Sequence, residues 1–151
     1  MHAADTAMIE QGDMFVNRGK INKFMRKLIS LLFRLNKSDR FKPDLLLQDG
    51  DDLSGYGLPA VIVALPGHSK GSLGILTTSG DLFCGDLLVN TKKPEVNTLI
   101  DEVPAMAASL EKIRGMQIQT VYPGHGNPFK MELFLSNYRF GFPDKSPSKR
   151  N

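Results

Sequence analysis

Three apolar segments of this chain each run into a glycine that is followed by a side chain able to bind a metal ion. They are Leu65-Pro66-Gly67-His68, Phe83-Cys84-Gly85-Asp86 and Tyr122-Pro123-Gly124-His125. An apolar strand fixes the position of its end, glycine lets the backbone turn sharply there, and the next side chain then projects into a cleft. The pattern predicts that the two imidazoles and the carboxylate meet in one pocket, with coordination positions left open for catalysis. Such ligands suit zinc, iron or manganese better than magnesium or calcium.

The order of hydrophobic patterns predicts an α/β fold. A continuous β-branched run (AVIVAL) is typical of a buried strand, whereas apolar residues spaced three and four apart indicate helices. The turn Thr78-Ser79-Gly80 predicts a hairpin between the strands on either side of it. The predicted strands are Asp44–Gln48, Ala60–Leu65, Gly71–Thr77, Asp81–Gly85 and Gln119–Tyr122, and the predicted helices are residues 3–11, 20–35, 103–114 and 131–138.

The basic charge is concentrated in one segment. Nine Lys and Arg residues lie between Arg18 and Lys42 against a single acid, Asp39, although the whole chain carries a net charge of only +3. The helix predicted at 20–35 within it is amphipathic, and we favour packing of its apolar side on the sheet or beside the mouth of a cleft. Contact of residues 20–35 with a membrane surface or another anionic partner is the second interpretation. Nucleic acid is disfavoured, because no stacking aromatics alternate with the basic residues.

Cys84 is the only cysteine, which excludes an internal disulfide framework and fits a reducing compartment. We interpret it as a buried core thiol rather than a nucleophile or ligand. No apolar run is long enough to span a bilayer and no secretory signal is recognisable, so a cytoplasmic location is expected. We expect one domain over residues 1–141, with the basic helical insertion at about 18–42, followed by a polar tail at 142–151.

The stretch LPGHSKGSLGILTTSGDLFCGD resembles the metallo-β-lactamase superfamily pattern, in which a PGHTxGS-type turn is followed by a hairpin and a terminal Gly-Asp. The later VYPGHG resembles the final histidine turn of that family, and DLLLQDGDDL the strand and turn before its first histidine. The resemblance covers about residues 44–128. It implies an αβ/βα sandwich with metals held at one edge. It also implies that His68 binds a first metal, that His125 binds a second, and that Asp86 bridges the two as the catalytic residue.

One part of the family pattern has no counterpart here. The diagnostic HxHxDH motif is absent, and His2 is the only histidine besides His68 and His125. The opening HAADTAMIE resembles the His-x-x-Asp segment that follows this motif in many members. We therefore expect an incomplete sandwich, the C-terminal portion of the domain, without the N-terminal strands and the HxHxDH loop. Each metal would then receive one histidine and a shared Asp86, so affinity should be lower than in a complete member.

The resemblance implies a metal-dependent hydrolase in which metal-bound hydroxide attacks an ester, thioester, lactone or phosphodiester of a small-molecule substrate. Zinc is the expected metal, with iron or manganese as alternatives and one or two ions in a complete member. Uncovered sheet edges call for a partner, either a homo-oligomer or a complementing N-terminal segment. The rival hypothesis is a non-catalytic, metal-poor binding or assembly module derived from the same fold. Fold alone does not choose the substrate.

Overall fold

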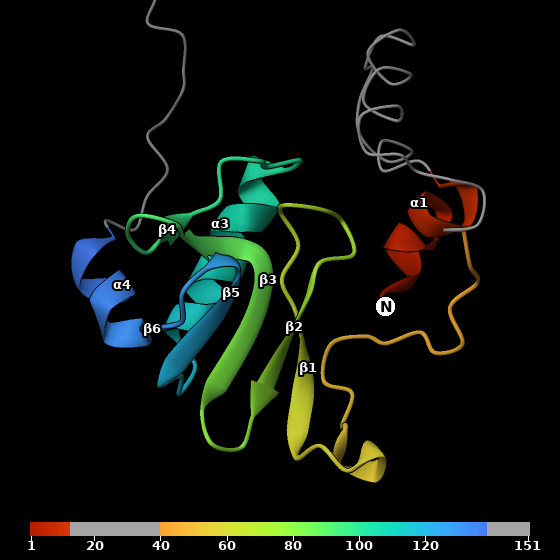
Figure 1. Ribbon diagram of the computed structural model, residues 1–151, viewed down its shortest axis with the longest axis horizontal. Coiled ribbons are helices and arrows are strands. Elements are labelled where there is room, and N and C mark those ends of the chain that lie inside the picture. Colours follow the sequence, from red (N-terminus) through yellow and green to blue (C-terminus); the bar gives the residue numbers. More distant parts are fainter. Residues whose placement is uncertain (13–39, 139–151) are drawn as a thin grey trace, which may run out of the picture.

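The computed structural model describes residues 1–12 and 40–138, which include a mixed sheet with two helices packed against one of its faces (Figure 1). The strand order is β1-β2-β3-β5-β6, with the short β4 paired to β3. All neighbouring strands are antiparallel except β3 and β5, which are parallel. The strands are β1 Ala60–Ala64, β2 Leu73–Thr77, β3 Asp81–Asn90, β4 Glu95–Val96, β5 Thr120–Gly126 and β6 Phe129–Lys130.

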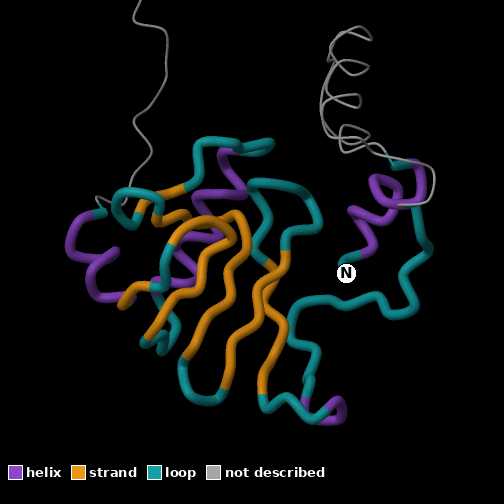
Figure 2. Tube along the Cα trace, in the orientation of Figure 1, coloured by secondary structure: helices purple, strands orange, loops and turns teal. Residues whose placement is uncertain are grey.

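The helices fall into two groups (Figure 2). Two of them, α3 (Val103–Arg114) and α4 (Met131–Asn137), lie against the sheet, whereas η1 (Ala3–Asp5) and α1 (Thr6–Gln11) lie on the other side of the β1–β2 connection. A short 3-10 turn, η3, covers Ser54–Tyr56. No helix among residues 1–12 and 40–138 is long and apolar enough to cross a bilayer.

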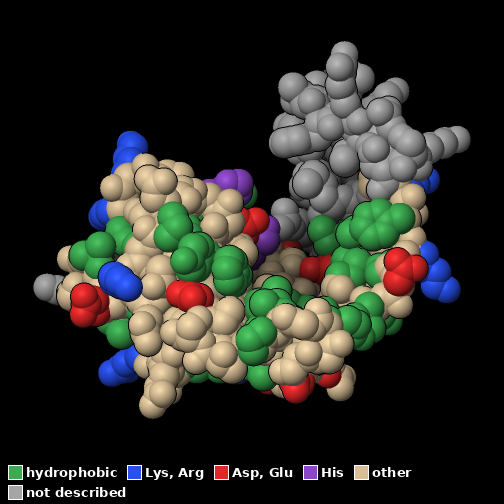
Figure 3. Space-filling view, turned by 60° about the horizontal axis from the view of Figure 1, so that its bottom comes forward, with side chains coloured by type: hydrophobic (Ala, Val, Ile, Leu, Met, Phe, Trp, Pro, Cys, Tyr) green, Lys and Arg blue, Asp and Glu red, His purple; other side chains and the backbone are tan. Residues whose placement is uncertain are grey.

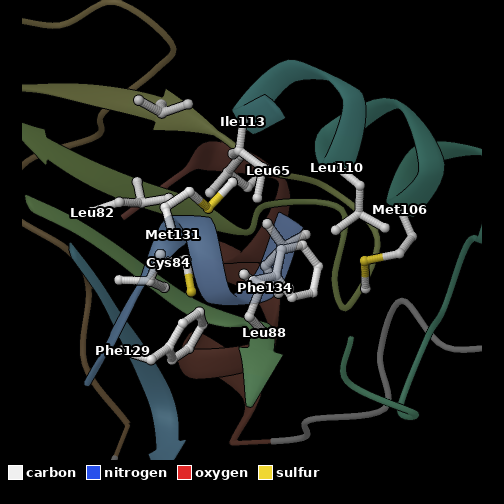
Figure 4. Packing of buried hydrophobic residues seen from close by; sticks show 13 residues of the cluster. Leu65, Leu82, Cys84, Leu88, Met106, Leu110, Ile113, Phe129, Met131 and Phe134 are labelled. Carbon is white, nitrogen blue, oxygen red and sulfur yellow. The ribbon is translucent and has the colours of Figure 1, made fainter. Parts of the chain in front are cut away.

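The core lies between the sheet and the helices α3 and α4 (Figure 4). Helix α3 presents Met106, Leu110 and Ile113 to it, which are spaced by four and three residues and therefore share one helical face. Phe134 of α4 is fully buried in the same cluster. The helix α3 begins with proline in its first turn, and Lys112 and Arg114 lie in its last turn, where positive charge complements the helix dipole.

Several sequence predictions are confirmed. The helix predicted at 103–114 is α3, residue for residue, and the run Ala60–Leu65 forms β1 to within one residue. The predicted hairpin is formed by β2 and β3 around Gly80, whose φ of +84° suits the turn. The helix predicted at 131–138 is α4, which ends one residue earlier at Asn137, and residues 3–11 form η1 followed by α1. The helix predicted at 20–35 and the polar tail at 142–151 lie outside the described residues.

Three predictions about strands are wrong, and the third, the end of β5, is described below with His125. Asp44–Gln48 is not a strand, and the segment just after it lies along the edge of β1 instead, where Ile62 N donates to Asp51 O at 2.9 Å and Asp52 bridges to Val61. In addition, the strand expected to end at Gly85 continues as β3 to Asn90. It can continue because it changes register against β5 on both sides of Gly85, an irregularity that bends a strand. Figure 1 shows the curved ribbon of β3.

Candidate metal centre

The turn after β1 fixes the backbone on both sides of His68. Gly67 has a φ of +145°, and a Cβ there would lie 2.7 Å from the Cα of Met106, so only glycine fits against α3. From the same helix the buried Ser109 donates its hydroxyl to Pro66 O at 2.6 Å. The Gly67 carbonyl accepts from the amides of Asp101 and Glu102 at 2.8 and 3.1 Å. Helix α3 and the loop before it therefore hold this turn in place.

A backbone carbonyl orients the imidazole ring of His68. Its Nδ1 lies 2.7 Å from Leu99 O, and because a carbonyl only accepts, Nδ1 carries the proton of this hydrogen bond. In the neutral ring Nε2 then carries the lone pair, which is the tautomer that a metal ligand needs. The carbonyl is itself positioned by the buried Asn97, whose Oδ1 accepts from Leu99 N at 3.0 Å.

Asp86 lies where β3 bends, next to the register shift against β5. Its side chain keeps one-third of its surface exposed, but its Oδ1 is buried and accepts no hydrogen bond from any of the described residues. Oδ1 also lies against the backbone of β5, because a Cβ on Gly124 would come within 2.5 Å of it. A buried carboxylate oxygen without a donor is costly, so a ligand at this position would stabilise it.

His125 is carried by β5, which continues through Pro123-Gly124-His125 to Gly126 rather than stopping at Tyr122 as predicted. Its side chain is 66% exposed. The end of this strand is attached to β3, since Asn90 Nδ2 donates to Asn127 O at 2.8 Å. The backbone that carries the His125 ring is therefore held in place by β3, whereas the ring itself is largely exposed to solvent.

The three predicted residues come together around one carboxylate. Nε2 of His68 lies 3.7 Å from Asp86 Oδ2, and Nε2 of His125 lies 3.3 Å from Asp86 Oδ1. Two ligands each about 2.1 Å from a tetrahedral metal would be separated by about 3.4 Å, so both distances suit a shared ion. Figure 3 shows histidine and acidic side chains side by side in a hollow of this face. The donor set fits a metal ligand site, and so does the buried Oδ1, which accepts no hydrogen bond from the described residues.

The arrangement is nevertheless open. Within residues 1–12 and 40–138 no three His, Cys, Asp or Glu side chains are gathered closely enough to form a preassembled metal site. The three residues form two pairs that share Asp86, not a closed cluster.

One other sequence interpretation can be checked against the structure. Cys84 is buried as predicted, and burial raises the pKa of its thiol to about 11. The third histidine, His2, is half-buried, and its Nδ1 accepts from Ala4 N at 3.1 Å. The sequence interpretation did not identify Asp5, whose carboxylate contacts the turn after His68.

Comparison with known proteins gives hydrolases as relatives. A hydroxyacylglutathione hydrolase of Aeromonas hydrophila subsp. hydrophila is 34% identical over 98 residues, covering 64% of this chain and 35% of the relative. The human acyl-coenzyme A thioesterase MBLAC2 is 30% identical over 110 residues, covering 64% of this chain and 37% of the relative. The chain thus spans about a third of the length of the curated relatives that it matches. No protein-family model matches it.

Solved structures with a similar fold also match the chain. The protein TTHA1623 in a di-iron-bound form superposes with a TM-score of 0.63 at 24% identity, over 88% of this chain and 59% of the other. The metallo-beta-lactamase family protein TTHA1429 from Thermus thermophilus gives 0.61 at 17% identity, over 86% and 47%. The chain has the metallo-β-lactamase fold. In this metallo-β-lactamase-fold protein, His68, Asp86 and His125 lie at one end of the sheet, on the turn after β1, the bend of β3 and the end of β5.

Proposed function

We propose that this metallo-β-lactamase-fold chain contributes to a metal-dependent hydrolase acting on a small acyl substrate. The observation that carries the proposal is the placement of two imidazoles against the two oxygens of Asp86, one of which is buried without a hydrogen-bond donor. The names of the matched relatives support hydrolysis. The di-iron-bound form of one structural neighbour supports metal use by the fold.

His68, Asp86 and His125 would hold the metal, and zinc suits this donor set, with iron or manganese as alternatives. A metal held there would act as a Lewis acid and would lower the pKa of a water bound to it toward roughly 7. His68 offers a pre-oriented Nε2 because its Nδ1 is committed to Leu99 O. Asp86 offers one oxygen toward each ring, which suits a bridging role. The exposed His125 lies on the side from which a substrate would approach.

We propose a thioester as the substrate class. Hydroxyacylglutathione and acyl-coenzyme A, which appear in the names of the two relatives, are both acyl groups on a thiol. A thioester hydrolysis needs only water as co-reactant, and the products are a carboxylic acid and a thiol. Esters, lactones and phosphodiesters are the competing classes, which a substrate panel separates.

We further propose that the active form has a partner, either a second copy or a complementing N-terminal segment. Ile75, Phe83 and Tyr122 are in register across β2, β3 and β5 and so share the sheet face opposite the core. Phe83 is 45% exposed and stacks on Tyr122 with the ring centroids 4.6 Å apart. An exposed phenyl ring stacked on a half-buried tyrosine of a sheet face favours burial against another surface.

The test compares the purified chain with its Asp86→Asn variant, using Asp44→Asn as a matched control because Asp44 is exposed and remote in sequence from the site. We expect wild type and Asp44→Asn to bind zinc and to hydrolyse a thioester, whereas Asp86→Asn should lose at least about 100-fold in turnover. Metal content is measured by mass spectrometry and thiol release by a chromogenic assay. Zinc binding with turnover equal in all three proteins would contradict the assignment.

The alternative is a non-catalytic assembly module. The open arrangement of the three side chains and the exposed ring of Phe83, stacked on Tyr122, favour it. In the same experiment this alternative predicts a chain that binds no metal and hydrolyses none of the substrates. Light scattering should nevertheless show an oligomer, and Phe83→Ser should shift it toward the monomer. A monodisperse monomer of the wild-type chain at micromolar concentration would contradict self-association, both for the hydrolase and for the assembly module.

A further inference from the structure

A carboxylate from the N-terminal segment contacts the turn that carries His68. Asp5 Oδ2 accepts from Ser69 Oγ at 2.5 Å, and Asp5 Oδ1 accepts from Gly71 N at 3.1 Å. The contact joins residues 64 and 66 positions apart in the sequence. The approach is close, because a Cβ on Gly71 would lie 2.6 Å from Asp5 Cγ. Gly71 therefore leaves the space that this carboxylate occupies.

Asp5 does not serve the helix that it precedes. It occupies the N-cap position of α1, where a carboxylate ordinarily accepts from the backbone amides of the first turn. Its side chain makes no such hydrogen bond. Both of its oxygens point instead at the turn between β1 and β2, so this side chain stabilises the turn and not its own helix.

The carboxylate fixes the direction of a chain of hydroxyl groups. Because ionised Asp5 can only accept, the Ser69 hydroxyl proton points to it, and Ser69 Oγ is left as an acceptor. The Ser72 hydroxyl, 2.8 Å away, must then donate to Ser69 Oγ, while Ser72 Oγ accepts from Ser69 N at 3.0 Å. A network with a single proton order is more rigid than one whose hydroxyls can reverse.

Ser69 directly follows His68, and Gly67 N donates to Ser69 O at 3.1 Å, so the network closes around the histidine's own backbone. We propose that Asp5 is a positioning residue that fixes the His68 turn and thereby keeps Nε2 of His68 directed at Asp86. The proposal rests on the proposed metal site for its functional consequence, but its structural consequence at His68 can be measured without metal.

The test uses the full chain and three variants. Asp5→Asn keeps the size and one acceptor but places an NH₂ group where a second acceptor is needed, so the Ser69 hydroxyl must turn away. Gly71→Ala pushes the carboxylate out of its space without touching its charge. Asp44→Asn makes the same substitution at an exposed acid that has no hydrogen bond or ion pair with the described residues. Thermal unfolding is recorded for all of them.

The first readout is the ring nitrogen spectrum of His68 in metal-free, ¹⁵N-labelled protein, assigned with His68→Gln. We expect wild type and Asp44→Asn to show one tautomer, protonated on Nδ1, whereas Asp5→Asn and Gly71→Ala show a mixture of both. The second readout is zinc affinity by chelator competition, which should fall by roughly 10–100-fold in the same two variants, as for other residues that orient a ligand.

An unchanged His68 spectrum in Asp5→Asn would overturn the proposal, and so would an equal change in Asp44→Asn. Lower thermal stability in Asp5→Asn and Gly71→Ala with the His68 tautomer retained would assign Asp5 a structural role only, and would also overturn it. If wild type binds no zinc, the proposed function fails, while the His68 spectrum still decides the role of Asp5.

Discussion

A methyl group added at Gly124 tests whether Asp86 must lie where the structure places it. In Gly124→Ala the new Cβ would lie 2.5 Å from Asp86 Oδ1, whereas ordinary contact begins at 3.4 Å, so the oxygen must move by about 0.9 Å. The backbone of Gly85, 3.1 to 3.2 Å from the same Cβ, limits how far β5 can retreat instead. Metal–ligand distances tolerate only about 0.2 Å, so we expect the carboxylate to be lost as a ligand.

With one of three donors displaced, zinc affinity should fall at least about 100-fold, beyond the usual cost of losing an orienting partner. Chelator competition measures this, and urea unfolding confirms that the variant is folded under the same conditions. The matched control is Gly115→Ala, where the new Cβ meets nothing closer than the Lys112 carbonyl at 3.7 Å. Equal zinc affinity in Gly124→Ala and wild type would refute the reasoning, whereas no binding by wild type would refute the metal site itself.

Two further predictions concern the core. Phe134 is fully buried, so Phe134→Ala should lower the free energy of unfolding by about 3–5 kcal/mol in urea titrations; a loss below about 1 kcal/mol would mean that α4 does not pack as described. Burial raises the pKa of the Cys84 thiol from 9.0 to about 11, because the folded protein disfavours the charged thiolate. The contribution of this thiol to the free energy of unfolding should therefore be constant below pH 9 and should fall by about 3 kcal/mol as the pH rises from 9 to 11. Cys84→Ala should flatten this alkaline decline, and the same slope in both proteins would contradict the burial.

Local sequence signals were sufficient where one element carries its own pattern. The apolar spacing of Met106, Leu110 and Ile113, with proline before and glycine after them, marks both ends of α3. The β-branched run of β1 and the Gly80 turn are similarly complete within a few residues. The pairing of His68 with Asp86 and of His125 with Asp86 followed from the shared motif at the three segments, since each lies at the same end of the sheet.

Features that depend on contacts between residues far apart in the sequence could not be predicted from local patterns. Gly85 looked like a strand end, but β3 continues because its pairing with β5 compensates for the change in register. Leu45 and Leu46 gave a strand-like pattern, yet both are exposed and no strand forms there. The sequence places Asp5 in a His-x-x-Asp segment but does not show what it contacts, because its partners lie more than 60 residues away.

The central claim is that His68, Asp86 and His125 bind metal together. It is tested most directly by an anomalous difference map, recorded at the zinc edge, from crystals of the zinc-loaded chain. The account predicts density at Asp86 within bonding distance of its carboxylate and of Nε2 of at least one of the two histidines. Zinc density only at other places, with the Asp86 carboxylate bare in the presence of excess zinc, would contradict it.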